Sequence, residues 1–298
     1  MLARLLPLAC LLACSAPFTT SAPASPAPAA EHLVWSDEFD PASALPNPAN
    51  WTYETGAGGW GNHEFETYCA PTSTQAPCDA NHPNASVAPD GYLHITARRS
   101  PASPAQLPAQ QPTWTSARLL SKGLQTFQYG RIEARIRIPS GPGVWPAFWM
   151  LGADIDTHPW PASGELDIME NIGKEPTEIH GSVHGSGFTG LALGKPFQLP
   201  SAPPFAAAFH TFGLLWSPGR IQYYVDDPTH PYATFTPADL PPGAVWPFDS
   251  RRFFLLLNLA IGGDWPGPPD ASTPTPSEML VDYVRVYQTS TPTSVPQP

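Results

Sequence analysis

The chain has 298 residues, which is enough for one large domain or two smaller ones. Hydrophobic residues make up 42% of it, sufficient for a sizeable core, whereas charged residues make up only 13%. Because Lys and Arg together number 14 and the formal net charge is −11, the composition argues against nucleic acid, an anionic membrane or a polyanionic substrate as a partner.

Residues 1–30 are predicted to be a signal peptide and a Pro/Ala-rich tether. After Arg4 comes an apolar run too short to span a bilayer as a helix. Cys14 follows Leu-Leu-Ala, which resembles a bacterial lipoprotein processing site, and the tract 16–30 is rich in Pro, Ala, Ser and Thr. We therefore expect an exported protein. It is either a cell-envelope lipoprotein with a lipid anchor on Cys14 or, as the alternative, an ordinary secreted protein.

The next notable feature is a pair of cysteines, Cys69 and Cys78. In an exported protein, an isolated pair this close in sequence is expected to form a disulfide. The bond would join the two ends of the loop between them. A zinc site is the alternative, with His63 and His82 flanking the loop, but no cluster of His and Cys has zinc spacing.

The remainder of the chain favours short strands. Residues 131–138 alternate strictly between polar and apolar side chains, as in a half-buried strand with one wet face, and residues 253–260 form the continuous apolar run of a strand covered on both sides. Further strands are predicted at 92–97, 212–216, 221–225 and 281–287. Many short strands separated by Gly and Pro clusters, without an amphipathic helix longer than ten residues, favour an all-β sandwich of the jelly-roll type.

The segment 164–171 reads Gly-Glu-Leu-Asp-Ile-Met-Glu-Asn and holds three carboxylates between apolar residues that favour a strand. On a regular strand, Glu165 and Asp167 share a face and Glu170 points the other way. A β-bulge near Ile168 and Met169 would bring all three to one face. The alternative is an exposed acidic strand edge.

A shared face would give these acids a function. Two carboxyl groups that face one cleft are the minimum equipment for cleaving a glycosidic bond. Crowded like charges also push their pKa values apart, so that one group can act as an acid while another stays ionised. A retaining mechanism would further require the side chains of Glu165 and Glu170 to lean toward each other over a concave surface, until their carboxyls are about 5–5.5 Å apart.

Several uncommon short sequence motifs occur in order along the chain, on both sides of this acidic segment. They lie at 34–39, 59–62, 115–118, 129–135, 145–152, 183–185, 257–263 and 281–287. Together with the acidic segment, they resemble glycoside hydrolase family 16 and, within it, the laminarinase-like endo-β-1,3-glucanases. The predicted domains are thus the leader and tether at 1–30, a family 16 catalytic domain at 31–288 and a disordered tail at 289–298.

The resemblance implies a concanavalin A-like β-jelly-roll sandwich of two antiparallel sheets, with a substrate cleft across the concave sheet. It also implies double displacement with retention of configuration, in which Glu165 is the nucleophile, Glu170 the general acid/base and Asp167 a hydrogen-bonding helper. The extra residue before Glu170 is the laminarinase-type spacing, because the lichenase-type segment is one residue shorter. No cofactor is expected for catalysis.

The same resemblance implies candidates for the cleft. The predicted substrate-binding residues are Asn62, Trp145, Trp149, Trp160, His184 and Trp265. The tryptophans would stack on sugar rings, although such residues serve equally in a β core. His184 would lie near the acid/base, although a lone His is more often structural. Asn62 and Glu66 fall in the Trp-Gly-Asn region, which contributes to the cleft in relatives, and Arg118 is either structural or substrate-contacting.

Family members often hold a structural calcium ion on the convex side, so a bound Ca²⁺ is a further prediction. Asp282 is the matching acid here, with Glu38 and the carbonyl of Gly91 as companions, and hard oxygen ligands suit calcium. The alternative is a solvated Asp on an outer strand.

The predicted function is retaining endo-hydrolysis of laminarin-type β-1,3-glucan, with mixed-linkage glucan as a related substrate. The expected partner is a β-glucan polysaccharide or oligosaccharide, with no nucleic acid, and the protein is expected to be a monomer. One alternative is a non-catalytic β-glucan-binding module on the same sandwich, which the intact acids argue against. The other is a family 16 enzyme acting on a different polysaccharide such as agarose.

Overall fold

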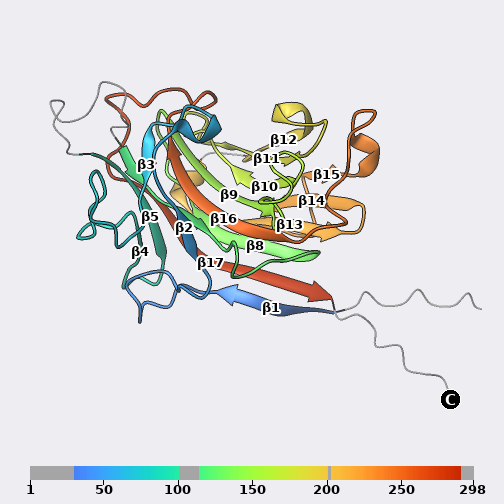
Figure 1. Cartoon of the computed structure of the whole chain (residues 1–298), viewed down its shortest axis with the longest axis horizontal. Helices are drawn as coiled ribbons and strands as arrows, with labels where there is room; N and C mark the ends of the chain where they lie inside the picture. The colour runs from blue at the N-terminus through green and yellow to red at the C-terminus, as the bar shows by residue number, and fades with distance from the viewer. Residues whose placement is uncertain (1–29, 101–113, 201–202, 290–298) are drawn as a thin grey trace, which may run out of the picture.

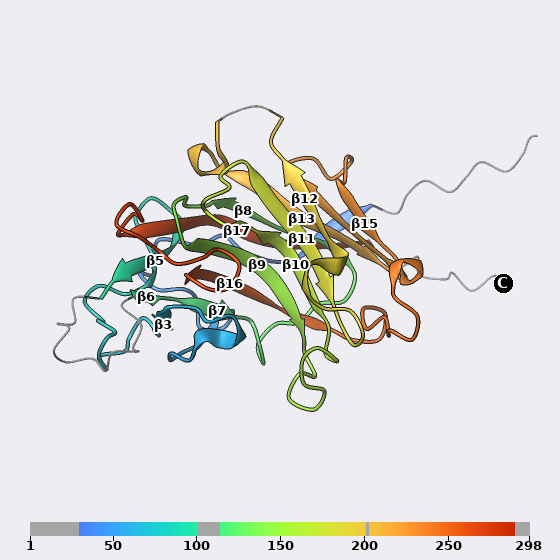
Figure 2. The ribbon, with the colours of Figure 1, turned by 90° about the horizontal axis from the view of Figure 1, so that it is seen from above.

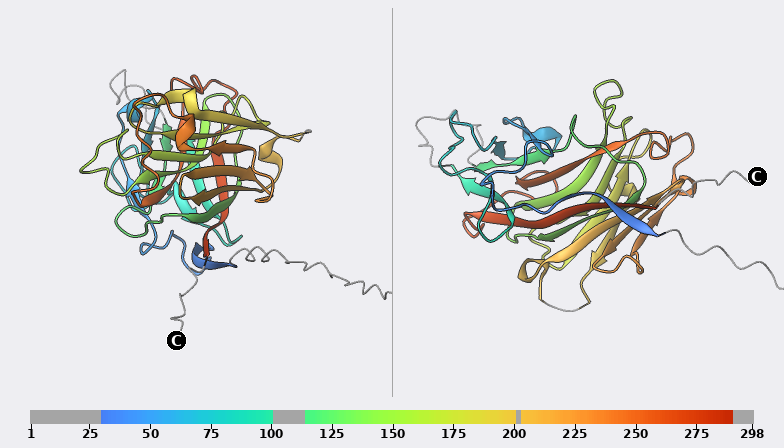
Figure 3. Two further views of the ribbon diagram at one scale, coloured as in Figure 1. Left: turned by 90° about the vertical axis from the view of Figure 1, so that its right-hand side faces the viewer. Right: turned by 90° about the horizontal axis from the view of Figure 1, so that it is seen from below.

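The computed structural model describes residues 30–100, 114–200 and 203–289, which form two sheets packed face to face (Figure 1). In this part of the chain the larger sheet has ten strands: β15 (Ala233–Phe235), β14 (Arg220–Val225), β13 (His210–Ser217), β8 (Gly130–Arg137), β17 (Ser277–Thr289), β5 (Leu93–Arg99), β6 (Trp114–Ser116) and β3 (Glu66–Tyr68) in order, with β1 (Glu31–Asp37) beside β17 and β4 (Ala85–Val87) beside β5. Figure 3 shows β1, in blue, beside β17, in red.

The smaller sheet carries the acidic segment and curves over the first sheet. Its seven strands among the described residues are, in order, β12 (Gly194–Gln198), β11 (Glu178–His184), β10 (Glu165–Glu170), β9 (Val144–Gly152), β16 (Phe253–Ile261), β7 (Arg118–Leu120) and β2 (Thr52–Glu54). Most of them lie side by side in the view from above (Figure 2). The predicted all-β sandwich is confirmed, and the pairing of β3 with β6 is parallel rather than antiparallel.

The helices in the described ranges are four short 3-10 helices. They are η1 (Gly59–Gly61), η2 (Gly190–Leu193), η3 (Phe205–Ala207) and η4 (Pro237–Asp239). The absence of a longer helix agrees with the sequence-based expectation for these residues. Within the same ranges, none of the helices has the length and apolar character needed to span a membrane.

The core lies between the two sheets, and the sequence patterns account for it. In β8, Ile132, Ala134 and Ile136 are fully buried in this core, as their alternation predicts. The opposite face of β8 is less exposed to solvent than expected. Glu133 on this face is only 5% exposed and accepts hydrogen bonds from Arg131 and Tyr224. Aliphatic burial at this scale is the main stabilising contribution to a sandwich of this kind.

Strand β16 is buried over all nine of its residues, which confirms the strand predicted to be covered on both sides. Its odd-numbered residues, such as Leu257, pack in the core between the sheets. Phe254 and Leu256 point to the other side and pack in a second apolar cluster with Leu120 and Leu151. The concave side of the smaller sheet is therefore partly lined by apolar side chains.

Two terminal predictions fall largely outside the described residues, namely the leader with Cys14 and most of the tail. Thr289, at the predicted start of the tail, is instead the last residue of β17. The predicted disulfide is present: Cys69 and Cys78 are bonded, with their Cα atoms 5.6 Å apart.

Candidate active site

The three acids lie on β10, and an irregularity in this strand orients them. Against β9, Asp167 is paired with Trp149 and Met169 with Phe148, so that Ile168 is the extra residue. The pairing with β11 also shifts between Asp167 and Glu170. This is the predicted β-bulge.

The bulge places two consecutive apolar side chains in the core. Ile168 is 1% exposed and Met169 is fully buried, and both belong to the core between the sheets. Because two neighbouring residues point inward, the alternation restarts and Glu170 points to the same side as Glu165 and Asp167. Apolar burial thus holds the acids on one face.

Strand register places small and polar residues beside the acids on this face. Glu170 is paired with Ala147 on β9, and Ala147 is paired with Asn258 on β16. Asn258 in turn is paired with Arg118 on β7. Because Ala147 is small, it forms a low floor between Trp145 and Trp149, which are two positions away on either side along β9. A sugar chain that lies across the strands would pass over this floor.

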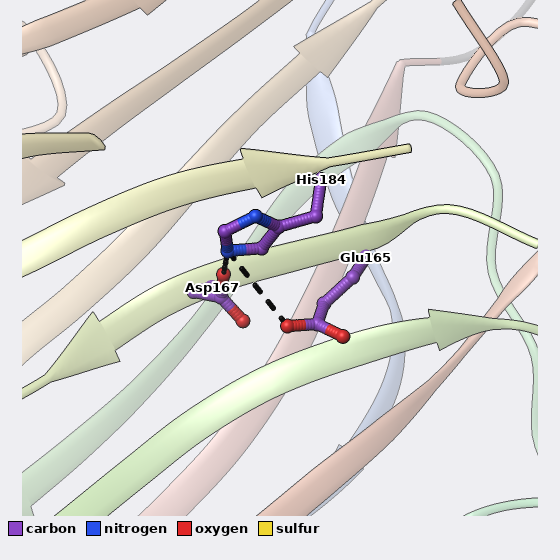
Figure 4. A group of neighbouring side chains, drawn as sticks. All are labelled: Glu165, Asp167 and His184. Atoms are coloured by element: carbon purple, nitrogen blue, oxygen red, sulfur yellow. Dashed lines mark ion pairs between the residues drawn. The ribbon is translucent and has the colours of Figure 1, made fainter. Parts of the chain in front are cut away.

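His184 on β11 lies beside Glu165 and Asp167 (Figure 4). Its Nε2 lies 2.9 Å from Oδ2 of Asp167 and 3.9 Å from Oε1 of Glu165. The Asp167 side chain is only 3% exposed, whereas that of Glu165 is 17% exposed. His184 thus contacts Glu165 and Asp167 directly, and its charge also lowers the pKa of Glu170, the predicted acid/base, against the larger effect of burial.

The acids have strongly perturbed proton affinities. Burial, followed by the charge of Asp167, raises the pKa of Glu165 to about 8. Burial also raises the pKa of Asp167 to about 7. The pKa of Glu170 is raised well above its ordinary value by burial and then by the charges of Asp167 and Glu165. Burial and the neighbouring carboxylates thus favour the protonated form of Glu170.

Two of the predicted tryptophans hydrogen-bond to the catalytic candidates. Nε1 of Trp145 donates to Oε1 of Glu170 over 3.1 Å. The hydrogen bond from Trp160 lowers the pKa of Glu165 against the larger effect of burial, and Trp160 is 49% exposed. Trp265 packs edge-on against Trp145, with ring centroids 5.6 Å apart. These tryptophans therefore lie near the acids, and Trp145 and Trp160 act as hydrogen-bond donors to them; stacking on sugar rings stays a prediction.

The remaining candidates lie toward β7 and the loop before β3. Arg118 pairs with Glu54 over 2.7 Å, and its guanidinium lies over the rings of Trp60 and Trp149, so its role is mainly structural. Asn62 is exposed and donates to Glu64.

Sequence reasoning assigned no role to Asn258, although the sequence contains a usable signal. It is the one polar residue in the apolar run of β16, and a buried polar side chain needs a partner. Its amide oxygen accepts from Nε1 of Trp149 over 2.7 Å, and its amide nitrogen donates to the hydroxyl of Tyr68 over 3.0 Å.

The predicted calcium ligands are engaged with arginines. Asp282 lies 2.5 Å from Arg135, and Glu38 forms two hydrogen bonds with Arg285, of 2.8 and 2.9 Å. Cationic partners of this kind do not fit a Ca²⁺ site, which needs free carboxylate oxygens. Calcium binding stays a prediction.

The raised pKa values lead to a prediction for stability. Between the ordinary pKa of 4.5 and its raised value in the fold, Glu170 binds more protons folded than unfolded, so this group makes stability fall as pH rises. We expect Glu170→Gln to raise the melting temperature at pH 8 by on the order of 5 °C, with the difference vanishing near pH 4. Glu278→Gln, on the other sheet, is the matched control. A pH-independent difference, or an equal gain in the control, would contradict this prediction.

The chain is similar to known proteins in both sequence and structure. The family model for glycosyl hydrolases family 16 matches residues 73–285. A β-glucanase of Rhodothermus marinus is 39% identical over 266 residues, which cover 86% of this chain and 85% of that protein. Glucan endo-1,3-β-glucosidase A1 of Niallia circulans is 36% identical over 283 residues, which cover 89% of this chain and 39% of that protein. The X-ray structure of an endo-β-1,3-glucanase from Pyrococcus furiosus has a TM-score of 0.77 and 40% identity, covering 88% of this chain and 95% of that one.

Proposed function

This chain belongs to glycosyl hydrolases family 16, and from that premise we propose that it is an endo-glycosidase that hydrolyses β-1,3-glucan of the laminarin type with retention of configuration. Its relatives named as β-1,3-glucanases support this substrate, and its low count of basic residues argues against a sulfated one. Mixed-linkage glucan is a second, poorer substrate in this proposal.

The observation that carries the proposal is the bulge that turns Glu165, Asp167 and Glu170 to one side of the concave sheet. The three carboxyls do not have equal environments. Glu165 and Asp167 share the imidazole of His184, whereas Glu170 accepts a hydrogen bond from the indole N–H of Trp145. Carboxyls in different environments can take the separate roles of nucleophile and acid.

In the first step, Glu170 donates its proton to the glycosidic oxygen while a carboxylate oxygen of Glu165 attacks the anomeric carbon. The bond between that carbon and the leaving oxygen breaks, and a glycosyl–Glu165 ester forms. Glu165 must be ionised at this point. Asp167 helps because it hydrogen-bonds to Glu165 and can hold the proton that the two share, while His184 stabilises the remaining negative charge.

In the second step, Glu170 is the base. It takes a proton from a water molecule whose oxygen attacks the anomeric carbon, and the ester bond to Glu165 breaks. The product keeps the original configuration, since the carbon has been inverted twice. Both enzyme carboxyls return to their starting protonation states.

Product analysis with laminarin, lichenan and agarose side by side tests the proposal. We expect oligosaccharides of mixed length from laminarin, slower release from lichenan and none from agarose. Binding of laminarin without any hydrolysis would favour a glucan-binding module. Hydrolysis of agarose alone would assign the chain to a different substrate within the family.

A further inference from the structure

A chain of hydrogen bonds runs from the cleft floor to a buried carboxylate, and all of its donors point the same way. Nε1 of Trp149 donates to Asn258 over 2.7 Å, Nδ2 of Asn258 donates to the Tyr68 hydroxyl over 3.0 Å, and that hydroxyl donates to Oε2 of Glu64 over 3.1 Å. From the other side, Nδ2 of Asn62 donates to Oε1 of Glu64 over 3.2 Å. We refer to these five residues as the Glu64 relay.

The relay ends at a side chain that accepts with both of its oxygens. Glu64 is 8% exposed and both of its oxygens accept, which suits a carboxylate rather than a carboxylic acid. Glu66 supports this distribution of charge. It is fully buried, and burial followed by the charge of Glu64 raises its pKa well above the usual range, so that it keeps a proton and donates to Glu64. Both oxygens of Glu64 are therefore available as acceptors for the relay.

The other end of the relay lies in the cleft. Trp149 is half-buried on the concave face, is paired with Asp167 across the strands and has the guanidinium of Arg118 over its ring, 4.7 Å from the centroid. Asn258 is paired with Ala147, which is paired with Glu170. The relay thus holds an indole ring and an amide one or two strands away from the catalytic acids.

A network of this kind could serve stability alone. Its layout argues for more, since Tyr68 and the terminal Glu64 are buried. Trp149, at the cleft end, and Asn62, which donates to the carboxylate from the other side, reach the surface. Each side chain of the relay is oriented by its hydrogen bond to the next one. A change at the buried end therefore alters the orientation of the Trp149 ring and the Asn258 amide in the cleft.

We propose that Glu64 and Tyr68 are positioning residues for substrate binding: the buried carboxylate terminates a one-way relay that orients the Trp149 indole and the Asn258 amide for the glucan units beyond the catalytic acids. The inference rests on the proposed function, because it assumes that a β-1,3-glucan lies along this floor. It adds a binding determinant that does not touch the substrate.

Tyr68→Phe tests the relay, because it removes one hydroxyl and keeps the ring. We expect KM for laminari-oligosaccharides to rise about five- to tenfold, the effect of one buried hydrogen bond, with kcat changed less than twofold. Tyr224→Phe is the matched control, since Tyr224 is 1% exposed and donates to Glu133 on β8, outside the relay. The control should lose similar thermal stability without any change in KM.

Glu64→Gln is the second variant, because its amide keeps the size of the side chain but cannot accept from both donors as the carboxylate does. In the double variant with Tyr68→Phe, we expect the KM effect to be well below the product of the single effects. An unchanged KM in Tyr68→Phe, an equal change in Tyr224→Phe or independent effects of the two relay variants would overturn the proposal.

The same variants in a Glu165→Gln background separate this inference from the proposed function. Calorimetric titration with a laminari-oligosaccharide then measures Kd without turnover. A Kd that is about five- to tenfold higher with Tyr68→Phe, the same factor as expected for KM, supports the relay. This result would hold even if the roles of the acids were revised. If the parent protein binds no β-1,3-glucan, the proposed function fails and the relay proposal fails with it.

Discussion

Glu165→Gln is expected to reduce laminarin hydrolysis by on the order of 10⁴-fold or more, because an amide oxygen cannot form the covalent intermediate. The measurement is kcat/KM from reducing-sugar release. Gln has nearly the same size as Glu and keeps a hydrogen-bond acceptor for Trp160, so folding and oligosaccharide binding should be retained.

Glu278→Gln is the matched control for this experiment. Glu278 lies on β17 of the other sheet, and its side chain is 43% exposed. The same chemical change there should leave kcat/KM unchanged. Turnover close to that of the parent protein in Glu165→Gln would remove Glu165 from the mechanism.

Glu170→Gln is the second variant with a large expected effect. An amide can neither donate the required proton to the leaving oxygen nor accept one from water, so kcat for glucan should fall about 10²–10⁴-fold. The loss should depend on the leaving group, because a nitrophenolate departs without protonation. In Glu170→Gln we therefore expect the rate of the first step to fall much less with aryl β-glycosides than with laminarin.

Burst kinetics with a nitrophenyl laminarioside measure this difference. Fast release of the first equivalent of nitrophenolate followed by slow turnover is expected in Glu170→Gln, since the missing base then limits the second step. Addition of azide, which needs no base, should restore turnover. An equal loss for aryl and glucan substrates, with no effect of azide, would argue that Glu170 is not the acid/base.

The bulge could be predicted from the sequence because two kinds of information agreed. Leu166, Ile168 and Met169 indicate a strand, whereas the step from Asp167 to Glu170 is odd. A single extra residue resolves the conflict, and the register shows it at Ile168. Strands with strict alternation or continuous burial, such as β8 and β16, were predicted for the same reason: their periodicity reports which face is buried.

Other parts of the structure leave no periodic signal. Strands of three residues, such as β3 and β7, are too short to show alternation. The Glu64 relay joins Tyr68 to Asn258, 190 residues away, so it exists only through the topology of the sheets. The hydrogen-bonding roles of Trp145 and Trp160 likewise depend on ring orientation, which composition and spacing do not determine.

The site also illustrates how stability and function oppose each other. Three carboxyls lie together in a poorly solvated position, and burial raises the pKa of each. Burial of crowded acids destabilises a fold, and the apolar anchoring of Ile168 and Met169 offsets this by fixing the bulge. The same desolvation helps Glu170, the acid, to hold the proton that it donates.

The most direct test of the central claim is to trap the covalent intermediate and locate it. A 2-deoxy-2-fluoro laminarioside with a dinitrophenyl leaving group should accumulate as an ester, because the fluorine slows both steps while the leaving group accelerates only the first. Proteolysis and mass spectrometry then identify the modified residue. We expect one glycosyl group per chain, attached to Glu165. An adduct on Asp167 or Glu170, or free sugar of inverted configuration without any adduct, would contradict it.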